Sequence, residues 1–506
     1  MKNLVTLALI LVTTLSFAQK RVTVKGSFDP EKYRSEYFDV AAVTDDQVIV
    51  IQGDALDGYL NVSTRFLAVN IVDKNTLETV KQKRFEDISF FGGETKFIDY
   101  WYNDGTIYII VSKTELLEYR LLEIDVRTLE LKENRDRLLF SIAKQYNENI
   151  GELSKKIERK IKYRTRITKS ENGEYIHFCV NTWGKDVKAK FKSLLLNKNG
   201  KVEHESMLDF ATEYADITSS LQNEVSNSGM VALYMHLYEN KKTNYVDLKA
   251  GGQVIAVSKE GKRTGFSEVK VSDEDFKKGA RVSLKIALKN ETLYIAGQET
   301  REGGYVAGVF PLNDLPDQGI LQYKDAYVGL HLYNGEITVL DDGSFLFMTN
   351  EFYVQKGDPD KNQVTKYIGD HVEIVKFDKT GKHIFTKKIE ANDVNYYDIN
   401  SQCYTQKAYV VNGKIYIFIN SSFGAVKCDD EVMKTAPGGD KRDKGALVTM
   451  NLDGSDLKNI SMRIKGDISL LNFYSRDLEQ LSDDTFFLPC KYHKKGNAAY
   501  LKVIIE

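Results

Sequence analysis

The chain has 506 residues and a formal net charge of -2, so it is either several domains or one large closed β structure. Its 70 basic and 72 acidic side chains nearly cancel, which gives no overall field for holding nucleic acid or an anionic membrane. With 6 prolines and no low-complexity tract, we expect the chain to be folded from end to end.

The first residues, MKNLVTLALILVTTLSFAQ, resemble a secretory signal peptide. Lys2 precedes an apolar stretch from Leu4 to Leu15, and Ser16-Phe17-Ala18 forms a small-x-small cleavage signal. We therefore expect residues 1–18 to be a bacterial signal peptide and residues 19–506 to be one domain. No cysteine follows the cleavage signal, so a lipid anchor of the bacterial lipoprotein kind is not expected. No later run reaches the ~20 apolar residues of a membrane span. The predicted location is the periplasm, the outer-membrane surface or the cell exterior.

A turn signal followed by a short apolar run recurs along the rest of the chain. Asp, Asn and Gly pairs supply the positive φ angles of a tight hairpin, and the β-branched and aromatic residues after them supply a strand. There are eight copies: TDDQVIVIQG from Thr44, NDGTIYIIVSK from Asn103, ENGEYIHFCVN from Glu171, SNSGMVALYMH from Ser226, KNETLYIAGQ from Lys289, DDGSFLFMTN from Asp341, VNGKIYIFINS from Val411 and SDDTFFLPCK from Ser482.

A second hairpin follows most copies, as in VEIVKFDKTGKHIFTKKI, and its last strand is charged and alternating. This gives four strands per unit, repeated roughly every 50 to 70 residues, with apolar inner strands and polar outer strands. The pattern predicts an all-β, single-domain, eight-bladed β-propeller, with seven blades as the alternative. The repeats lack the Gly-His and Trp-Asp signatures of the WD class.

The two ends of the domain predict how the ring closes. After the eighth copy only Ala498 to Glu506 remains, so the last unit lacks an outer strand. The segment RVTVKGSF, Arg21 to Phe28, precedes the first unit and could supply it.

Four cysteines occur in the sequence. Cys179 and Cys490 lie in apolar runs, where we expect buried thiols. Cys403 and Cys428 flank one predicted hairpin, and a disulfide between them is the less favoured alternative to two free thiols.

One acidic loop, GDPDKNQVTKYIGD, carries Asp358, Asp360 and Asn362 at alternate positions, the oxygen-ligand spacing with which calcium loops begin. Gln363 stands where such loops have glycine, and no glutamate occupies the twelfth position. A calcium site is therefore a weak prediction and a solvated polar loop the favoured one; no other cofactor is indicated.

Sequence motifs of catalysis are absent. The chain has no phosphate-binding glycine loop, no Gly-x-Ser-x-Gly and no His-Glu-x-x-His. His177 and His236 lie in predicted second strands, where packed, hydrogen-bonded histidines are expected. The basic stretch Leu153 to Arg166 has a helical spacing of apolar residues, which predicts a helix on the rim.

The insertions all fall between second and third strands or between units, on one face of the predicted ring. Long loops on a rigid scaffold are where binding usually resides. We therefore predict a non-catalytic protein that binds an envelope protein or peptide with this long-loop face; the alternative is a hydrolase or lyase acting on an extracellular polysaccharide or other polymer. The candidate binding residues lie in two insertions: Tyr353, Lys356, Asp429, Asp430, Glu431, Lys441 and Arg442.

Overall fold

The computed structural model describes most of the strands and the tight turns of the chain. The described residues are 22–28, 37–53, 66–86, 95–113, 118–132, 137–142, 161–184, 187–208, 216–238, 250–270, 282–299, 305–315, 321–323, 332–355, 366–395, 408–420, 426–428, 431–432, 445–461, 471–473, 479–492 and 498–505. The predicted signal peptide lies outside them.

The described strands form antiparallel sheets, which we number in chain order. Sheet 1 contains β2 (Tyr37–Val43), β3 (Gln47–Gly53), β4 (Phe66–Asp73) and β5 (Thr79–Glu86). Sheet 2 contains β6 (Thr95–Asn103), β7 (Thr106–Lys113), β8 (Glu118–Asp125), β9 (Glu130–Leu131) and β10 (Arg137–Ser141). Sheet 3 contains β11 (Ile161–Lys169), β12 (Tyr175–Gly184), β13 (Val187–Asn197) and β14 (Val202–Leu208). Sheet 4 contains β15 (Asp216–Val225), β16 (Val231–Tyr238), β17 (Ala250–Val257) and β18 (Arg263–Lys270).

The second half of the chain repeats this order. Sheet 5 contains β19 (Val282–Lys289), β20 (Thr292–Glu299), β21 (Tyr305–Pro311) and β22 (Leu321–Tyr323). Sheet 6 contains β23 (Leu332–Val339), β24 (Phe345–Gln355), β25 (Lys366–Phe377), β26 (His383–Asn395), β29 (Val426–Cys428) and β30 (Glu431–Val432). Sheet 7 contains β27 (Ala408–Val411), β28 (Lys414–Asn420), β31 (Gly445–Asn451) and β32 (Lys458–Ser461). Sheet 8 contains β33 (Leu471–Phe473), β34 (Glu479–Ser482), β35 (Thr485–Tyr492), β36 (Ala498–Ile505) and β1 (Val22–Phe28).

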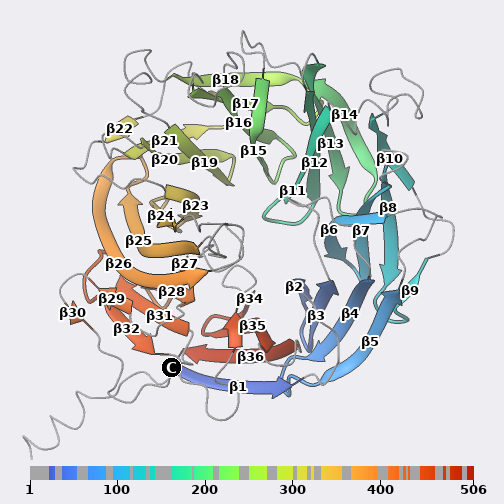
Figure 1. Ribbon diagram of the computed structural model, residues 1–506. Coiled ribbons are helices and arrows are strands. Elements are labelled where there is room, and N and C mark those ends of the chain that lie inside the picture. Colours follow the sequence, from blue (N-terminus) through green and yellow to red (C-terminus); the bar gives the residue numbers. More distant parts are fainter. Residues whose placement is uncertain are drawn as a thin grey trace, which may run out of the picture.

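The sheets follow one another around a ring, as Figure 1 shows. The first strand of each sheet, such as β2, β6 and β11, lies nearest the centre, and the fourth strand lies at the periphery. The all-β prediction and the propeller arrangement are confirmed. The N-terminal strand β1 pairs with β36, with Val22 opposite Ile505 and Val24 opposite Val503.

Burial explains the graded polarity of the strands. All five residues from Ile107 to Val111 on β7 are buried, because a sheet packs on each face of this second strand. On the outer strand β14, by contrast, exposed and half-buried residues alternate from Val202 to Met207.

The tight turns have the geometry that their sequences predict. Asp104 and Gly105 have φ of 44° and 73°, and Asn412 and Gly413 have 49° and 70°. Two successive positive φ angles are typical of the type I′ hairpin, whose twist matches that of the flanking strands.

In several turns between third and fourth strands, an aspartate carboxylate accepts backbone N–H groups of the turn. The carboxylate Oδ1 of Asp125 accepts the backbone N–H of Arg127 at 2.8 Å and of Thr128 at 3.1 Å. These bonds lower the pKa of Asp125 by stabilising its ionised form. Asp73 accepts the corresponding two N–H groups in sheet 1, and Asp378 of sheet 6 accepts those of Thr380 and Lys382.

At sheet 3 this turn also docks on the preceding sheet. Trp101 of β6 donates its indole N–H to the carbonyl of Lys198 at 2.8 Å, and Asn103 donates to Asn199 at 2.9 Å. A Cβ at Gly200 would lie 2.4 Å from a Leu121 methyl group, so the turn requires glycine for this close approach as well as for its φ of 71°.

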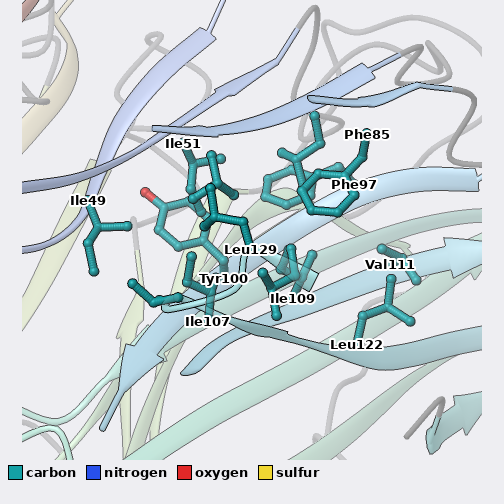
Figure 2. Close-up of a cluster of buried hydrophobic side chains, with 14 of the residues drawn as sticks. Ile49, Ile51, Phe85, Phe97, Tyr100, Ile107, Ile109, Val111, Leu122 and Leu129 are labelled. Atoms are coloured by element: carbon teal, nitrogen blue, oxygen red, sulfur yellow. The ribbon is translucent and has the colours of Figure 1, made fainter. Parts of the chain in front are cut away.

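Between neighbouring sheets lie hydrophobic seams. The seam between sheets 1 and 2, drawn in Figure 2, brings Ile49 and Ile51 of β3 against Phe97, Tyr100 and Ile107. Each of these side chains is at most 2% exposed. Dispersion and burial of apolar area therefore hold adjacent sheets face to face.

Three segments differ from the sequence-based expectations. The helix predicted for Leu153 to Arg166 is wrong from Ile161 onward, where β11 begins, because Tyr163, Thr165 and Ile167 favour a strand. Residues 153–160 lie outside the described part. The predicted loop from Glu351 is occupied by β24 up to Gln355.

The third segment is the long insertion after β28. It contains β29 and β30, and β29 pairs with the outer strand of the preceding sheet, with Ile389 opposite Cys428 and Ala391 opposite Val426. An exposed strand edge satisfies its free N–H and C=O groups by such pairing. The insertion therefore links sheet 7 to the periphery of sheet 6.

Candidate functional site

The sequence-predicted site residues are only partly within the described residues. Tyr353 lies on β24 opposite Ile368, and Glu431 lies on β30 opposite Cys428. The other predicted binding, calcium and disulfide residues lie outside the described part, and their roles stay predictions: Lys356, Asp358, Asp360, Asn362, Cys403, Asp429, Asp430, Lys441 and Arg442.

Strand order assigns the connections to two faces. Short turns join first to second strands and, except for residues 312–320 in sheet 5, third to fourth strands, and in antiparallel sheets these connections share one edge. We call this the hairpin face. The connections 54–65, 239–249, 356–365 and 421–444 join second to third strands, and so begin and end at the opposite edge, the long-connection face.

A belt of polar side chains lies on the innermost strands. Each second strand begins with a run of buried residues after its turn. In six sheets, the residue of the first strand that lies opposite the fourth residue of this run is polar. These residues, which we call the inner belt, are Asp39, Asp99, Arg166, Gln222, Lys285 and Glu336, and their partners are Ile51, Ile110, Cys179, Tyr234, Ala296 and Met348. All six belt residues are half-buried.

The belt side chains point from one sheet toward the next. Gln222 of sheet 4 shows this directly: its amide donates to the carbonyl of Leu284 at 2.8 Å and accepts the N–H of Ile286 at 3.1 Å, both on β19. The partners of the belt residues face the same way, since Ile51 packs against sheet 2 and Ile110 against sheet 3. The belt is therefore a ring of side chains at one level around the centre.

Local backbone irregularity accompanies the belt. The strand register shifts within two residues of Asp39, Asp99, Gln222 and Glu336. Bulges of this kind redirect side chains and occur often beside functional sites. Asp39 and Asp99 also form the same bond, each accepting the N–H of the next residue at 2.8 Å.

Charges on sheets 1 and 3 act on the Asp99 carboxyl of sheet 2. Burial raises the pKa of Asp99 to about 6, Lys169 and Arg166 of β11 lower it, and Asp39 of β2 raises it. Burial therefore has a larger effect on this carboxyl than the two cations beside it. The Lys169 ammonium is exposed and lies 5.3 Å from the centre of the Tyr100 ring.

Two carboxyl groups on the innermost strands of sheets 4 and 6 act on one another electrostatically. Burial and, to a smaller extent, the charge of Glu336 on β23 raise the pKa of Glu224 on β15 to about 8. Near neutral pH, Glu224 is therefore largely protonated, a state in which a carboxylic acid can donate a proton or a hydrogen bond.

His177 is fully buried in a hydrogen-bonded network between sheets 3 and 4. Its Nε2 lies 2.8 Å from the Ser193 hydroxyl, and its Nδ1 accepts the Asn223 amide at 2.9 Å. With Asn223 donating to Nδ1, the ring proton belongs on Nε2 and is donated to Ser193. Burial lowers the pKa of His177 to about 3, so the ring is neutral. The prediction of a packed, hydrogen-bonded histidine is confirmed.

Cys179 is fully buried with a free thiol, and burial raises its pKa to about 12, as expected of an inert cysteine. Among the described residues, no three His, Cys, Asp or Glu side chains are placed to hold a metal ion. Within the same part of the chain, no helix is long and apolar enough to cross a membrane.

Sequence reasoning missed the inner belt, although its residues have a shared signal. Each is a polar residue in a first strand, and its partner is always the fourth residue of the buried run after the turn. Differences in turn length and the register shifts vary its distance from that run, so Asp99, paired with Ile110, and Arg166, paired with Cys179, do not align by spacing alone.

No family model and no curated protein matches the sequence. Solved structures with a similar backbone course include a prolyl endopeptidase, with 8% identity and a TM-score of 0.41. That match covers 90% of this chain and 55% of the endopeptidase chain, so this chain spans about half the length of the endopeptidase. Polysaccharide lyase Uly1 matches over 94% of this chain and 100% of its own, with 10% identity and a TM-score of 0.36. The Dos1 propeller matches over 93% and 95%, with 8% identity and a TM-score of 0.39.

Proposed function

We propose that this protein is an exported, non-catalytic β-propeller that binds an envelope or extracellular protein or peptide on its long-connection face. The observation that supports the proposal is the uneven distribution of connections. Apart from the connection 312–320 in sheet 5, the hairpin face has tight turns, whereas the second-to-third connections vary in length from 185–186 to 421–444 and all begin at the opposite edge. Variable connections on a rigid scaffold are typical of binding surfaces. The half-buried inner belt adds polar groups near the centre of the same ring.

The proposed form is an eight-bladed ring, closed where β1 completes sheet 8 and delivered by a cleaved signal peptide to the periplasm, outer-membrane surface or exterior. Val22→Asp with Val24→Asp should lower the free energy of unfolding by a few kcal/mol, since burying one valine contributes roughly 1.5 to 3 kcal/mol. Thr23→Asp, on the opposite side of the strand, is the control. Equal melting temperatures for all three proteins would contradict closure through β1.

The binding proposal is tested by replacing residues 434–444 with a short Gly-Ser linker. Stability should hardly change, because the free energy of loop closure depends weakly on length. Partners captured from an envelope extract should be lost or reduced relative to the wild type. Lys382→Ser, at an exposed turn of the hairpin face, is the matched control and should capture the wild-type set. Identical partner sets for wild type and the replaced loop would argue against the binding role of this insertion.

A hydrolase or lyase acting on an extracellular polymer is the second candidate, because the innermost strands carry a largely protonated carboxyl group, Glu224, and a second carboxyl group, Glu336, whose charge acts on it. Such a pair can serve as general acid and base in glycoside cleavage. Incubation with a panel of polysaccharides should then release products with the wild type and none with Glu224→Gln. Equal product release by both proteins would exclude Glu224 as the acid.

A further inference from the structure

Four Asn-Gly pairs occur in the sequence, and three of them lie in hairpin turns: Asn172-Gly173, Asn199-Gly200 and Asn412-Gly413. The fourth, Asn334-Gly335, lies on β23. The side chain of an asparagine can react with the backbone nitrogen of a following glycine, because glycine has no side chain to shield that nitrogen. Asn199 and Asn412 are each followed by Gly-Lys. A difference in reactivity between these two must therefore come from the fold.

The fold restrains the Asn199-Gly200 turn. The backbone N–H of Gly200 donates to the carbonyl of Asn197 at 2.8 Å, and the side-chain carbonyl of Asn199 accepts the amide of Asn103 at 2.9 Å. Gly200 is also buried, against the Leu121 side chain of sheet 2. Both reacting groups are thus held, and this turn must open locally before they can meet.

The Asn172-Gly173 turn is restrained in the same way. The backbone N–H of Gly173 donates to the carbonyl of Ser170 at 2.9 Å. The side-chain carbonyl of Asn172 accepts the Ser170 hydroxyl at 2.8 Å and the N–H of Glu174 at 3.1 Å. Reaction at Asn172 therefore also requires local opening.

The Asn412-Gly413 turn has none of these restraints. Both residues are exposed, and nothing lies within 4 Å of the place that a Cβ on Gly413 would occupy. Within the described part of the chain, neither the Asn412 side chain nor the Gly413 N–H makes a hydrogen bond. Only the direct pairing of Val411 with Lys414 closes this two-residue turn.

We propose that Asn412 is a site of spontaneous deamidation in the folded protein, whereas the fold protects Asn172 and Asn199. The Gly413 backbone nitrogen gives up its proton and bonds to Cγ of Asn412. The Cγ–Nδ2 bond breaks, and the side-chain amide leaves with that proton as ammonia. Water then opens the cyclic imide at either carbonyl. The products are aspartate and isoaspartate, in which the backbone runs through the side-chain carbon.

The two products differ in how they fit the turn. Aspartate is compatible with it, since Asp104-Gly105 forms the same kind of turn in sheet 2, with φ of 44° and 73°. Isoaspartate adds a carbon to the backbone of a two-residue turn and so disturbs the pairing of Val411 with Lys414. The strand β28 runs from this turn to the insertion 421–444. Deamidation itself does not depend on the proposed binding function.

The test is incubation of the purified protein in mildly alkaline buffer, folded and in urea, with peptide mass spectrometry of the three turns over time. The slowing of conversion by folding should be at least about tenfold greater for Asn199 and Asn172 than for Asn412, because their turns lose hydrogen bonds when they open. Equal slowing at Asn199 and Asn412 would overturn the proposal. So would an Asn412 that stays intact in the folded protein while the unfolded chain reacts.

Two variants at the same position test the consequence for stability. Asn412→Asp should melt like the fresh wild type, since aspartate fits the turn. Asn412→Gln should keep its initial melting temperature during incubation, because its longer side chain does not form the five-membered imide readily. The melting temperature of the wild type should fall as isoaspartate accumulates. An equal fall in Asn412→Gln would overturn the role given to isoaspartate at this turn.

Discussion

The seam between sheets 1 and 2 and the seam between sheets 3 and 4 are built from different chemistry. Between sheets 1 and 2, Ile49, Ile51 and Ile107 pack against aromatic rings, and the seam excludes water by apolar contact alone at these positions (Figure 2). Between sheets 3 and 4, the corresponding second-strand position holds His177, which needs Ser193 and Asn223 to satisfy its two ring nitrogens. The seam between sheets 1 and 2 can accept other well-packed apolar side chains, whereas the seam between sheets 3 and 4 depends on specific hydrogen-bond partners.

The polar seam also contains a group with no partner. Asn181 lies on the same face of β12 as His177, is 0% exposed, and makes no hydrogen bond with either amide atom. Burying an unpaired amide costs free energy, so this seam is less stable than its buried area indicates. Within this polar seam, replacing a polar by an apolar group should therefore have opposite effects at His177, which has partners, and at Asn181, which has none.

The largest effect is expected in the apolar seam. Ile107→Ala should lower the free energy of unfolding by about 3 kcal/mol, because the fully buried side chain leaves a cavity between two sheets. Val80→Ala, at a 61% exposed position on β5, is the control and should change stability by less than about 0.5 kcal/mol. Denaturant unfolding measures both, and similar values for the two would contradict the packing account.

His177→Leu should cost about 2 kcal/mol at neutral pH. The apolar substitute leaves the Ser193 hydroxyl without its imidazole partner and the Asn223 amide with only its longer bond, 3.3 Å, to the backbone carbonyl of residue 177. Ser193→Ala added to His177→Leu should recover part of the loss, since one unpaired group is then removed. A single mutant as stable as the wild type would mean that the network contributes nothing.

The stability difference between the wild type and His177→Leu should depend on pH. The folded-state pKa of His177, about 3, lies below the ordinary value of 6.5, so the unfolded chain binds the proton more readily. Stability from neutral His177 is complete above pH 6.5 and is lost as pH falls, by up to about 1.4 kcal/mol per pH unit. Asp99 and Glu224 titrate in the wild type and in His177→Leu alike, so their contributions cancel in the difference between the two free energies of unfolding. The deficit of His177→Leu should therefore vanish near about pH 5, and a constant deficit would refute a neutral buried ring.

The smallest effect has the opposite sign. Asn181→Leu replaces the unpaired amide by an apolar group of similar size and should raise the free energy of unfolding by up to about 1 kcal/mol. Thermal melting at neutral pH measures it. A loss of stability comparable to that of His177→Leu would indicate that Asn181 has partners in solution.

Residue patterns predicted the parts of this fold that repeat. The Asp-Gly and Asn-Gly turns, the buried runs such as Ile107–Val111 and the polar outer strands follow from local chemistry, so they could be derived in advance. The pairing of β29 with β26 could not, because a three-residue strand has no periodicity to detect. The inner belt was missed for another reason: Asp99 and Arg166 are brought together by successive sheets, which local spacing does not encode.

The binding role of the long-connection face is tested most directly by hydrogen exchange on the complex with a captured partner. The account predicts slower exchange in residues 54–65, 356–365 and 421–444 and on the inner strands β6 and β11, with no change in the hairpin turns 44–47 and 103–106. Protection confined to the hairpin turns would place the partner on the opposite face and contradict the account.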